Sequence, residues 1–221
     1  MLNDTNQGPD NLIGAREDIE LLSKKDMARL LVISDCHGHT SIMENIVRQF
    51  GKECDALIFC GDGAGDLISL ITSAEKDKEL RKLIPGVIAF ARGNGDPAMY
   101  PASENSLVKL PDTQILKVNN QNIMIVHGHR EGVDFGLENL ALEMQLSDCK
   151  TAFYGHTHIA REDRLDDYRI INPGSCGRPR GGQPNSFAIV TIGRNFVDTG
   201  YLKLSTDLDG NKCYSHWMPI Y

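Results

Sequence analysis

Six of the seven histidines in the chain fall into three pairs, with a single residue between the two members of each pair. They are His37 and His39, His127 and His129, and His156 and His158, while His216 stands apart. A single histidine is more often a hydrogen-bonded or surface residue than a ligand, and we expect this of His216 and His39. The set as a whole is different, because each pair follows the end of a short apolar run. Ligands bind at the carboxyl ends of strands in open α/β sheets, so the pairs predict a binding site.

Carboxylate and amide side chains follow the same kind of apolar run, at Asp35, Asp62, Asn94 and Asp96. Asp35 and His37 lie two residues apart, so on an extended backbone they would point the same way. Carboxylate, imidazole and amide donors without a thiolate suit Mn²⁺, Fe or Zn²⁺ better than a Ca²⁺ cage or a structural zinc.

Seven of these side chains are candidate metal ligands: Asp35, His37, Asp62, Asn94, His127, His156 and His158. Seven ligands are too many for one tetrahedral ion and are about right for two. Two ions roughly 3.5–4 Å apart activate a water nucleophile and stabilise the charge of an in-line displacement. The residue types therefore predict metal-assisted hydrolysis of a phosphoryl group.

The segments that must position these side chains alternate between strand and helix patterns. Short runs rich in β-branched residues and bounded by glycine predict buried strands over 30–34, 56–60, 86–90, 123–126, 152–154 and 169–171. Helical patterns lie between them, over 41–50, 67–83 and 135–146. A hairpin is expected over 107–126, with its turn at 119–122, followed by strands over 187–192, 196–204 and within 208–218. This order predicts an α/β fold, a layered α/β/β/α sandwich of two mixed sheets flanked by helices.

The first 26 residues differ from the rest of the chain. Their start is polar, and Leu12, Ala15, Ile19 and Leu22 then recur at helical spacing. We expect 1–26 to be an N-terminal extension with a short helix packed on the edge of the fold. Because we find no internal repeat, we expect 27–221 to form a single domain.

Composition narrows the class of protein. The 221 residues are 41% hydrophobic and carry a formal net charge of −7, which indicates a globular chain that does not bind polyanions indiscriminately. The six cysteines form no C-x-x-C pair, no stretch approaches the roughly 20 apolar residues of a membrane span, and the first residues do not resemble a secretory signal. We therefore expect a cytoplasmic protein with reduced thiols, in which Cys36 and Cys60 pack as small apolar residues.

Five short motifs occur in the order found in the calcineurin-like metallophosphoesterases. They are D-x-H at 35–37, G-D at 61–62, G-N-x-D at 93–96, H-G-H at 127–129 and G-H-T-H at 155–158. Each motif alone is a weak signal, but five in order are a strong one. The chain resembles most closely the small single-domain bacterial and archaeal phosphodiesterases of this superfamily, which also carry N-P-G-S, here at 172–175. The resemblance covers roughly Met27 to the end of that loop.

This resemblance implies a two-metal phosphodiesterase. One ion would be held by Asp35, His37 and His158, the other by Asn94, His127 and His156, with Asp62 bridging them. A hydroxide between the two divalent ions would attack phosphorus, and diesters would be preferred to monoesters. We expect Mn²⁺ first, with Fe, Zn²⁺, Ni²⁺ and Co²⁺ as alternatives. The expected partner is a small phosphodiester rather than nucleic acid or a membrane, and assembly into a homo-oligomer is left open.

Five further residues concern catalysis and substrate binding. Many relatives carry a histidine within G-N-x-D that can protonate the leaving group, whereas this chain has Gly95. Asp96 cannot donate a proton while ionised, so we expect it to orient its neighbours in the catalytic centre. His129 would touch the substrate or hydrogen-bond to a ligand residue. Arg178 and Arg180 could grip a phosphate with their guanidinium groups; the alternative is that both are solvated loop charges.

Two other functions compete with phosphodiester hydrolysis. A retromer subunit is similar in fold and works as a non-catalytic protein-interaction scaffold, with its ligand positions altered. Here all seven positions match, which favours the enzyme. A nuclease that uses the same metals should show a long basic groove or an added DNA-binding domain, and neither is visible in this short acidic chain.

Overall fold

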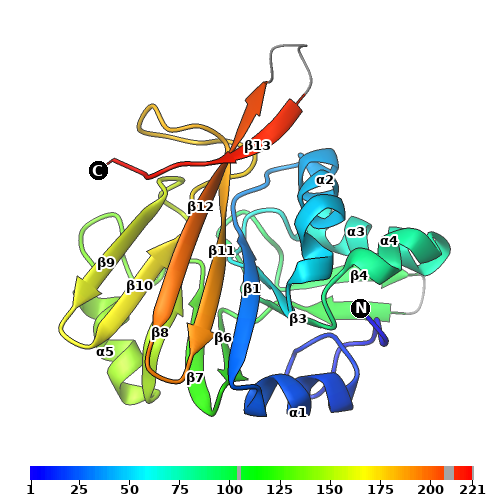
Figure 1. The fold of residues 1–221 in the computed structure, drawn as a ribbon, viewed down its shortest axis with the longest axis horizontal. Helices are drawn as coiled ribbons and strands as arrows, with labels where there is room; N and C mark the ends of the chain where they lie inside the picture. Colours follow the sequence, from blue (N-terminus) through cyan, green and yellow to red (C-terminus); the bar gives the residue numbers. More distant parts are fainter. Residues whose placement is uncertain (104–105, 207–211, 221) are drawn as a thin grey trace.

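The computed structural model describes residues 1–103, 106–206 and 212–220, and its core is two facing β-sheets (Figure 1). The first sheet has six strands in the order β13-β12-β11-β1-β2-β3. Its members are β1 (Met27–Ile33), β2 (Ala56–Phe59), β3 (Val87–Phe90), β11 (Ser186–Gly193), β12 (Val197–Thr206) and β13 (Lys212–His216). β1, β2 and β3 run parallel, and β11 joins β1 antiparallel. The sheet is therefore mixed, as predicted.

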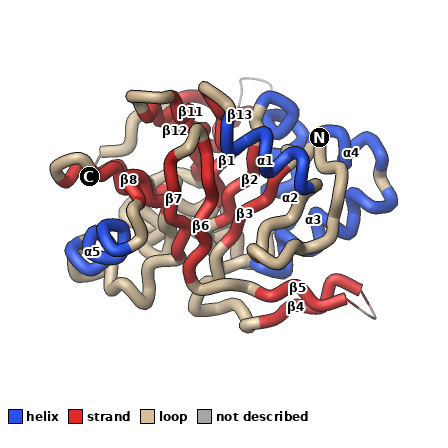
Figure 2. Tube along the Cα trace, turned by 90° about the horizontal axis from the view of Figure 1, so that it is seen from below, coloured by secondary structure: helices blue, strands red, loops and turns tan. Residues whose placement is uncertain are grey.

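The second sheet has five strands in the order β6-β7-β8-β10-β9. They are β6 (Thr113–Val118), β7 (Gln121–Val126), β8 (Cys149–Phe153), β9 (Arg161–Leu165) and β10 (Tyr168–Asn172). β7, β8 and β10 run parallel, whereas β6 and β9 join the two edges antiparallel. A separate hairpin of β4 (Met99–Ser103) and β5 (Ser106–Lys109) projects beside the first sheet (Figure 2).

Helices cover the outer faces of both sheets and complete the predicted α/β/β/α layers. On the first sheet lie α2 (Thr40–Phe50), the short turn η1 (Gly51–Glu53), α3 (Ala64–Lys76) and α4 (Lys78–Leu83), and on the second lies α5 (Glu138–Leu146). Along β1, Leu31 and Ile33 pack on the helices while Leu30 and Val32 pack between the sheets. Successive side chains alternate between the faces of a strand, so a strand buried on both faces has no polar alternation.

Several predicted boundaries shift, each for a local reason. The helix predicted over 67–83 is two helices, because the Asp77 carboxylate accepts hydrogen bonds from the N–H groups of Glu79 and Leu80 and starts α4. The hairpin expected over 107–126 is shorter, since β6 and β7 form it and residues 106–109 pair with β4, a strand that was not predicted. The strand β9 was not predicted either, because REDRL is exposed and highly charged. Part of the strand expected within 208–218 lies outside the described residues, and the rest is β13.

The N-terminal extension contains a shorter helix than its periodicity indicates, α1 (Arg16–Lys24). Leu12 and Ala15 precede this helix, because Ile13 forms a β-bridge with Ile88 at the edge of β3. Leu2 and Ile13 are fully buried, so the extension packs against the first sheet. Within the described part of the chain, no helix combines the length and apolar character needed to cross a membrane.

Two of the cysteines differ from the expected reduced state. The structure joins Cys36 to Cys176 in a disulfide, with the Cα atoms 5.3 Å apart, a separation that such a bond requires. The two loops meet because the N–H of Cys176 donates to the carbonyl oxygen of Ser34. The partners are 140 residues apart in sequence, so the pairing follows from the topology and not from any local motif.

We expect this disulfide to appear in a thiol count. Cys54, Cys60, Cys149 and Cys213 are free among the described residues, so the denatured, unreduced protein should react with four equivalents of iodoacetamide. After reduction it should react with six, the number of cysteines in the chain. Intact mass spectrometry distinguishes the two results, and six additions without reductant would show that Cys36 and Cys176 only pack together.

Candidate metal centre

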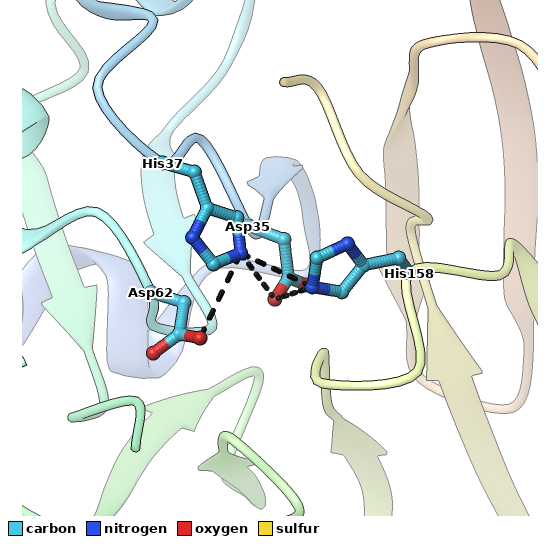
Figure 3. Close-up of side chains that lie close together, drawn as sticks. All are labelled: Asp35, His37, Asp62 and His158. Carbon is cyan, nitrogen blue, oxygen red and sulfur yellow. Dashed lines mark hydrogen bonds and ion pairs between the residues drawn. The ribbon is translucent and has the colours of Figure 1, made fainter. Parts of the chain in front are cut away.

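Four of the predicted ligands form one cluster, in which His37 is half-buried and the other three are buried (Figure 3). One donor atom from each of Asp35, His37, Asp62 and His158 lies within 4.8 Å of the others. Asp35 and His37 follow β1, Asp62 follows β2 and His158 follows β8 in the other sheet. The carboxyl ends of parallel strands in both sheets therefore meet here, as the histidine pairs predicted.

The other three candidate ligands, Asn94, His127 and His156, lie beside this cluster, and His127 connects them to its Asp62. Asn94 Oδ1 lies 3.1 Å from His127 Nε2 and 3.0 Å from His156 Nδ1. Asp62 Oδ2 lies 3.6 Å from His127 Nε2 and 3.7 Å from His37 Nε2. The Asp62 carboxylate thus stands between the two groups of ligands, and the structure brings all seven predicted side chains together.

The outward ring nitrogen of three histidines faces an acceptor, which fixes the state of the inward nitrogen. His127 Nδ1 donates to the carbonyl oxygen of Cys60 at 2.7 Å, and His158 Nδ1 donates to that of Arg178 at 2.5 Å. His156 Nε2 lies 2.8 Å from Asp134 Oδ2 and donates to it. In a neutral ring the other nitrogen then carries a lone pair. All three lone pairs point into the site.

The donor set fits divalent cations. Lone pairs of His127 and His156 both face the oxygen of Asn94, and acceptors that face one another need a positive charge between them. Asp35 is fully buried, and its Oδ1 lies 3.2 Å from His158 Nε2, which is a second acceptor when that ring is neutral. A buried carboxylate oxygen in that position is costly unless a charged partner satisfies it. Carboxylate, imidazole and amide donors suit Mn²⁺, Fe or Zn²⁺.

Five of the seven ligands have a left-handed backbone, which corrects the extended geometry expected for the D-x-H motif. Positive φ angles occur at Asp35, His37, Asp62, His156 and His158, between 47° and 67°. Few residues other than glycine adopt this region, although Asp, Asn and His are enriched there. Such strain collects at functional sites, where the surrounding structure enforces it. Sharp turns after the strands, and not strand periodicity, bring the ligands together.

Mutual charge sets the protonation of the cluster. Burial alone would raise the pKa of Asp62, but His127 and the N–H of Gly95 outweigh it and lower that pKa to about 2. Burial alone would lower the pKa values of His127 and His158, but Asp62 and Asp35 respectively raise them above the ordinary histidine value. Burial lowers the pKa of His37. Cations that bind here therefore compete with protons for the same nitrogens.

Asp96 and His129, both predicted to assist catalysis, have different hydrogen-bond surroundings. The Asp96 carboxylate accepts hydrogen bonds from four backbone N–H groups, those of Asp62, Gly63, Ala64 and Gly93. It therefore shapes the loop that carries Asp62. The His129 ring centroid lies 5.4 Å from that of His127, and its buried Nδ1 has no hydrogen-bond partner among the described residues.

The two predicted arginines flank the cluster. The carbonyl oxygen of Arg178 accepts a hydrogen bond from His158. Burial lowers the pKa of His37, and the positive charge of the Arg178 guanidinium adds a smaller effect in the same direction. The N–H of Arg180 donates to the carbonyl oxygen of His158 at 3.1 Å. Both side chains are exposed, so they are available to a ligand at the site.

Sequence reasoning missed several residues that hold the ligands in place. Ser34 Oγ donates to Asp35 Oδ2 at 2.6 Å, and Ser175 Oγ donates to the Asp35 carbonyl at 2.7 Å. Asp66 accepts from the N–H of Gly38. Asn172 and Ser175 belong to the N-P-G-S motif that the chain shares with the superfamily, so the motif could have predicted this supporting role. Asp134 carries no sequence signal of its own.

Replacing Asp134 tests its role in orienting His156. We expect Asp134→Ala to weaken divalent-metal affinity about 10- to 100-fold, the usual effect of removing a carboxylate that fixes a histidine ligand. Isothermal titration with Mn²⁺ measures it. Asp163→Ala is a matched control, because Asp163 pairs with Arg161 and contacts no candidate ligand. Equal affinity in Asp134→Ala and the wild type would contradict the role.

Comparison with known proteins agrees with this geometry. The family model of the calcineurin-like phosphoesterase superfamily domain matches residues 28–195. The chain is 28% identical to the probable metallophosphoesterase YsnB of Bacillus subtilis over 74% of its length and 83% of that protein. It is 29% identical to the phosphodiesterase YfcE of Escherichia coli, over 74% of its length and 88% of that protein.

A solved structure shares the fold at lower identity. Vps29 of Entamoeba histolytica in complex with Zn²⁺ superposes with a TM-score of 0.59 at 20% identity, covering 86% of this chain and 98% of that one. At this identity the likeness concerns the fold alone.

Proposed function

The chain belongs to the calcineurin-like phosphoesterase superfamily, and from this premise we propose that it hydrolyses phosphodiester bonds with two divalent metal ions. The proposal rests above all on the convergence of seven donor side chains, with Asp62 between the other six. Its relatives include a bacterial protein named as a phosphodiesterase. We take Mn²⁺ as the first metal, and Fe, Zn²⁺, Ni²⁺ and Co²⁺ as alternatives that the same donors accept.

The chain's own residues divide the work. Asp35, His37 and His158 would hold one ion, Asn94, His127 and His156 the other, and Asp62 would lie between them. When bound, the two ions supply an activated water nucleophile and neutralise the charge of the phosphate in an in-line displacement. Arg178 and Arg180, both exposed at the edge of the cluster, would bind a non-bridging oxygen of the substrate. His129 would border the phosphate from the side of His127.

The substrate would need a good leaving group, because no acid stands at Gly95. The N–H of Gly95 donates to Asp62 Oδ1 at 2.7 Å, and a Cβ at this position would lie 3.2 Å from the same oxygen. A side chain here would therefore contact the Asp62 carboxylate closely, and one of the two would have to shift slightly. The acidic net charge of −7 further favours a small diester over a nucleic acid.

A screen with two chromogenic esters tests the proposal. The chelated, metal-free protein is loaded with Mn²⁺, Fe²⁺, Zn²⁺, Ni²⁺ or Co²⁺ and assayed with bis(p-nitrophenyl) phosphate and p-nitrophenyl phosphate. We expect metal-dependent release of p-nitrophenol, faster from the diester than from the monoester. Inactivity with every metal would overturn the proposal and favour the alternative function, a non-catalytic protein-interaction scaffold.

A further inference from the structure

A groove of about 670 Å³ opens beside the metal centre. It lies between the loop before α5, the loop after β8 and the edge strand β9. Among its lining residues are Asp134, which hydrogen-bonds to His156, and Thr157, which stands between His156 and His158. One end of the groove is therefore the wall of the metal centre, and a substituent on a phosphate bound there would extend into it.

The side chains of this groove favour a flat apolar group. Phe135 is 97% exposed although it lines the groove. Ile159 and Leu165 add apolar surface, and Leu165 is 39% exposed. Ligand pockets are typically lined by apolar and aromatic side chains with a few placed polar groups. An exposed aromatic ring offers a face on which a planar ring can stack.

The charges of the groove favour one phosphate rather than several. Arg161 is neutralised by Asp163 at 2.6 Å. In contrast, the guanidinium of Arg180 makes no hydrogen bond or ion pair with any residue that the structure describes, while its backbone is fixed to His158. Arg180 is thus a cation held beside the phosphate position. Asp134 and Glu138 line the same groove and would repel further phosphates along it.

We propose that the substrate is a phosphodiester with one planar aromatic ester group, of the size of a single nucleoside, that stacks on Phe135. This inference rests on the proposed function and specifies its substrate class. The phosphate lies at the metal centre, Arg180 binds one of its oxygens, and the aromatic group occupies the groove between Phe135 and β9. The other ester oxygen carries the leaving group.

Two substrates with the same leaving group test the groove. Thymidine 5′-(p-nitrophenyl phosphate) and methyl p-nitrophenyl phosphate both release p-nitrophenol, so a difference in kcat/KM between them reports the group that stays on the phosphate. We expect the wild type to prefer the thymidine ester at least tenfold. Because stacking of one base on an aromatic side chain accounts for roughly a tenfold effect, Phe135→Ala should lower that preference about tenfold.

Phe196→Ala is the matched control, since Phe196 is an exposed aromatic residue in the turn between β11 and β12. It should leave the preference as in the wild type. Hydrolysis of both esters at equal efficiency, or an unchanged preference in Phe135→Ala, would overturn the groove inference while the phosphodiesterase function stands. Failure to hydrolyse either ester would overturn the proposed function itself.

Discussion

Asp62→Asn should lower kcat/KM for bis(p-nitrophenyl) phosphate about a thousandfold. The Gly95 N–H bonds to Oδ1, so the asparagine keeps its oxygen there and places its NH₂ group where Oδ2 stood. That atom lies 3.6 Å from His127 Nε2 and 3.7 Å from His37 Nε2, so in the proposed mechanism it would bridge the two ions. An NH₂ group offers no lone pair for this bridge. The variant therefore loses several kcal/mol of transition-state stabilisation. Because each 1.36 kcal/mol changes the rate tenfold, this loss corresponds to about a thousandfold lower kcat/KM.

Metal content should change together with the rate. Plasma mass spectrometry of the Mn²⁺-loaded proteins should show about two ions for each wild-type chain and about one for Asp62→Asn. Asp167→Asn removes the same charge from a side chain that is 86% exposed, and it should match the wild type in both measurements. If Asp62→Asn keeps the wild-type rate and both ions, Asp62 does not bridge the metals.

The sequence was sufficient to predict that the seven candidate ligands lie close together, because the ends of neighbouring parallel strands lie at the same edge of a sheet. Each candidate ligand follows the carboxyl end of a strand rich in β-branched residues, and the carboxyl ends of two neighbouring parallel strands lie side by side. Asp35 and Asp62 illustrate this: β1 and β2 pair in register, so the residues after them must be neighbours. The layered fold followed in the same way, from strands that are apolar on both faces and helices between them.

The supporting contacts could not be predicted, because they depend on where distant loops fall. Asp134 meets His156 across 22 residues and Ser175 meets Asp35 across 140 residues, with no pattern that connects them in sequence. The left-handed backbone at the ligands was also missed. Strand periodicity extends only as far as the last paired residue, and Asp35 already lies in the turn with a φ of 54°.

Asp96→Asn should destabilise the fold and, through it, the metal centre. Oδ2 of Asp96 accepts from the N–H groups of Asp62 and Gly93, and Oδ1 accepts from those of Gly63 and Ala64. An asparagine has one acceptor oxygen, so its NH₂ group must face two N–H donors whichever way it turns. Each unsatisfied N–H costs about 1–3 kcal/mol. Because Asp96 is only half-buried, we expect a loss of about 2–4 kcal/mol in the free energy of unfolding.

Urea denaturation of the metal-free protein measures this loss without any contribution from bound ions, which stabilise the folded state by mass action. Asp77→Asn is the matched control, since Asp77 also accepts from two backbone N–H groups but uses a single oxygen, Oδ1, for both, while its Oδ2 pairs with Arg48 at the surface. An asparagine at Asp77 can keep the Oδ1 acceptor and loses only this exposed ion pair, which contributes little, so its unfolding midpoint should fall less than that of Asp96→Asn. Equal midpoints in the two variants would mean that the four bonds to Asp96 do not act together. The expected result is a midpoint that falls further in Asp96→Asn than in the control, together with weaker Mn²⁺ binding. It would identify Asp96 as the residue that holds the Asp62 loop in its metal-binding form.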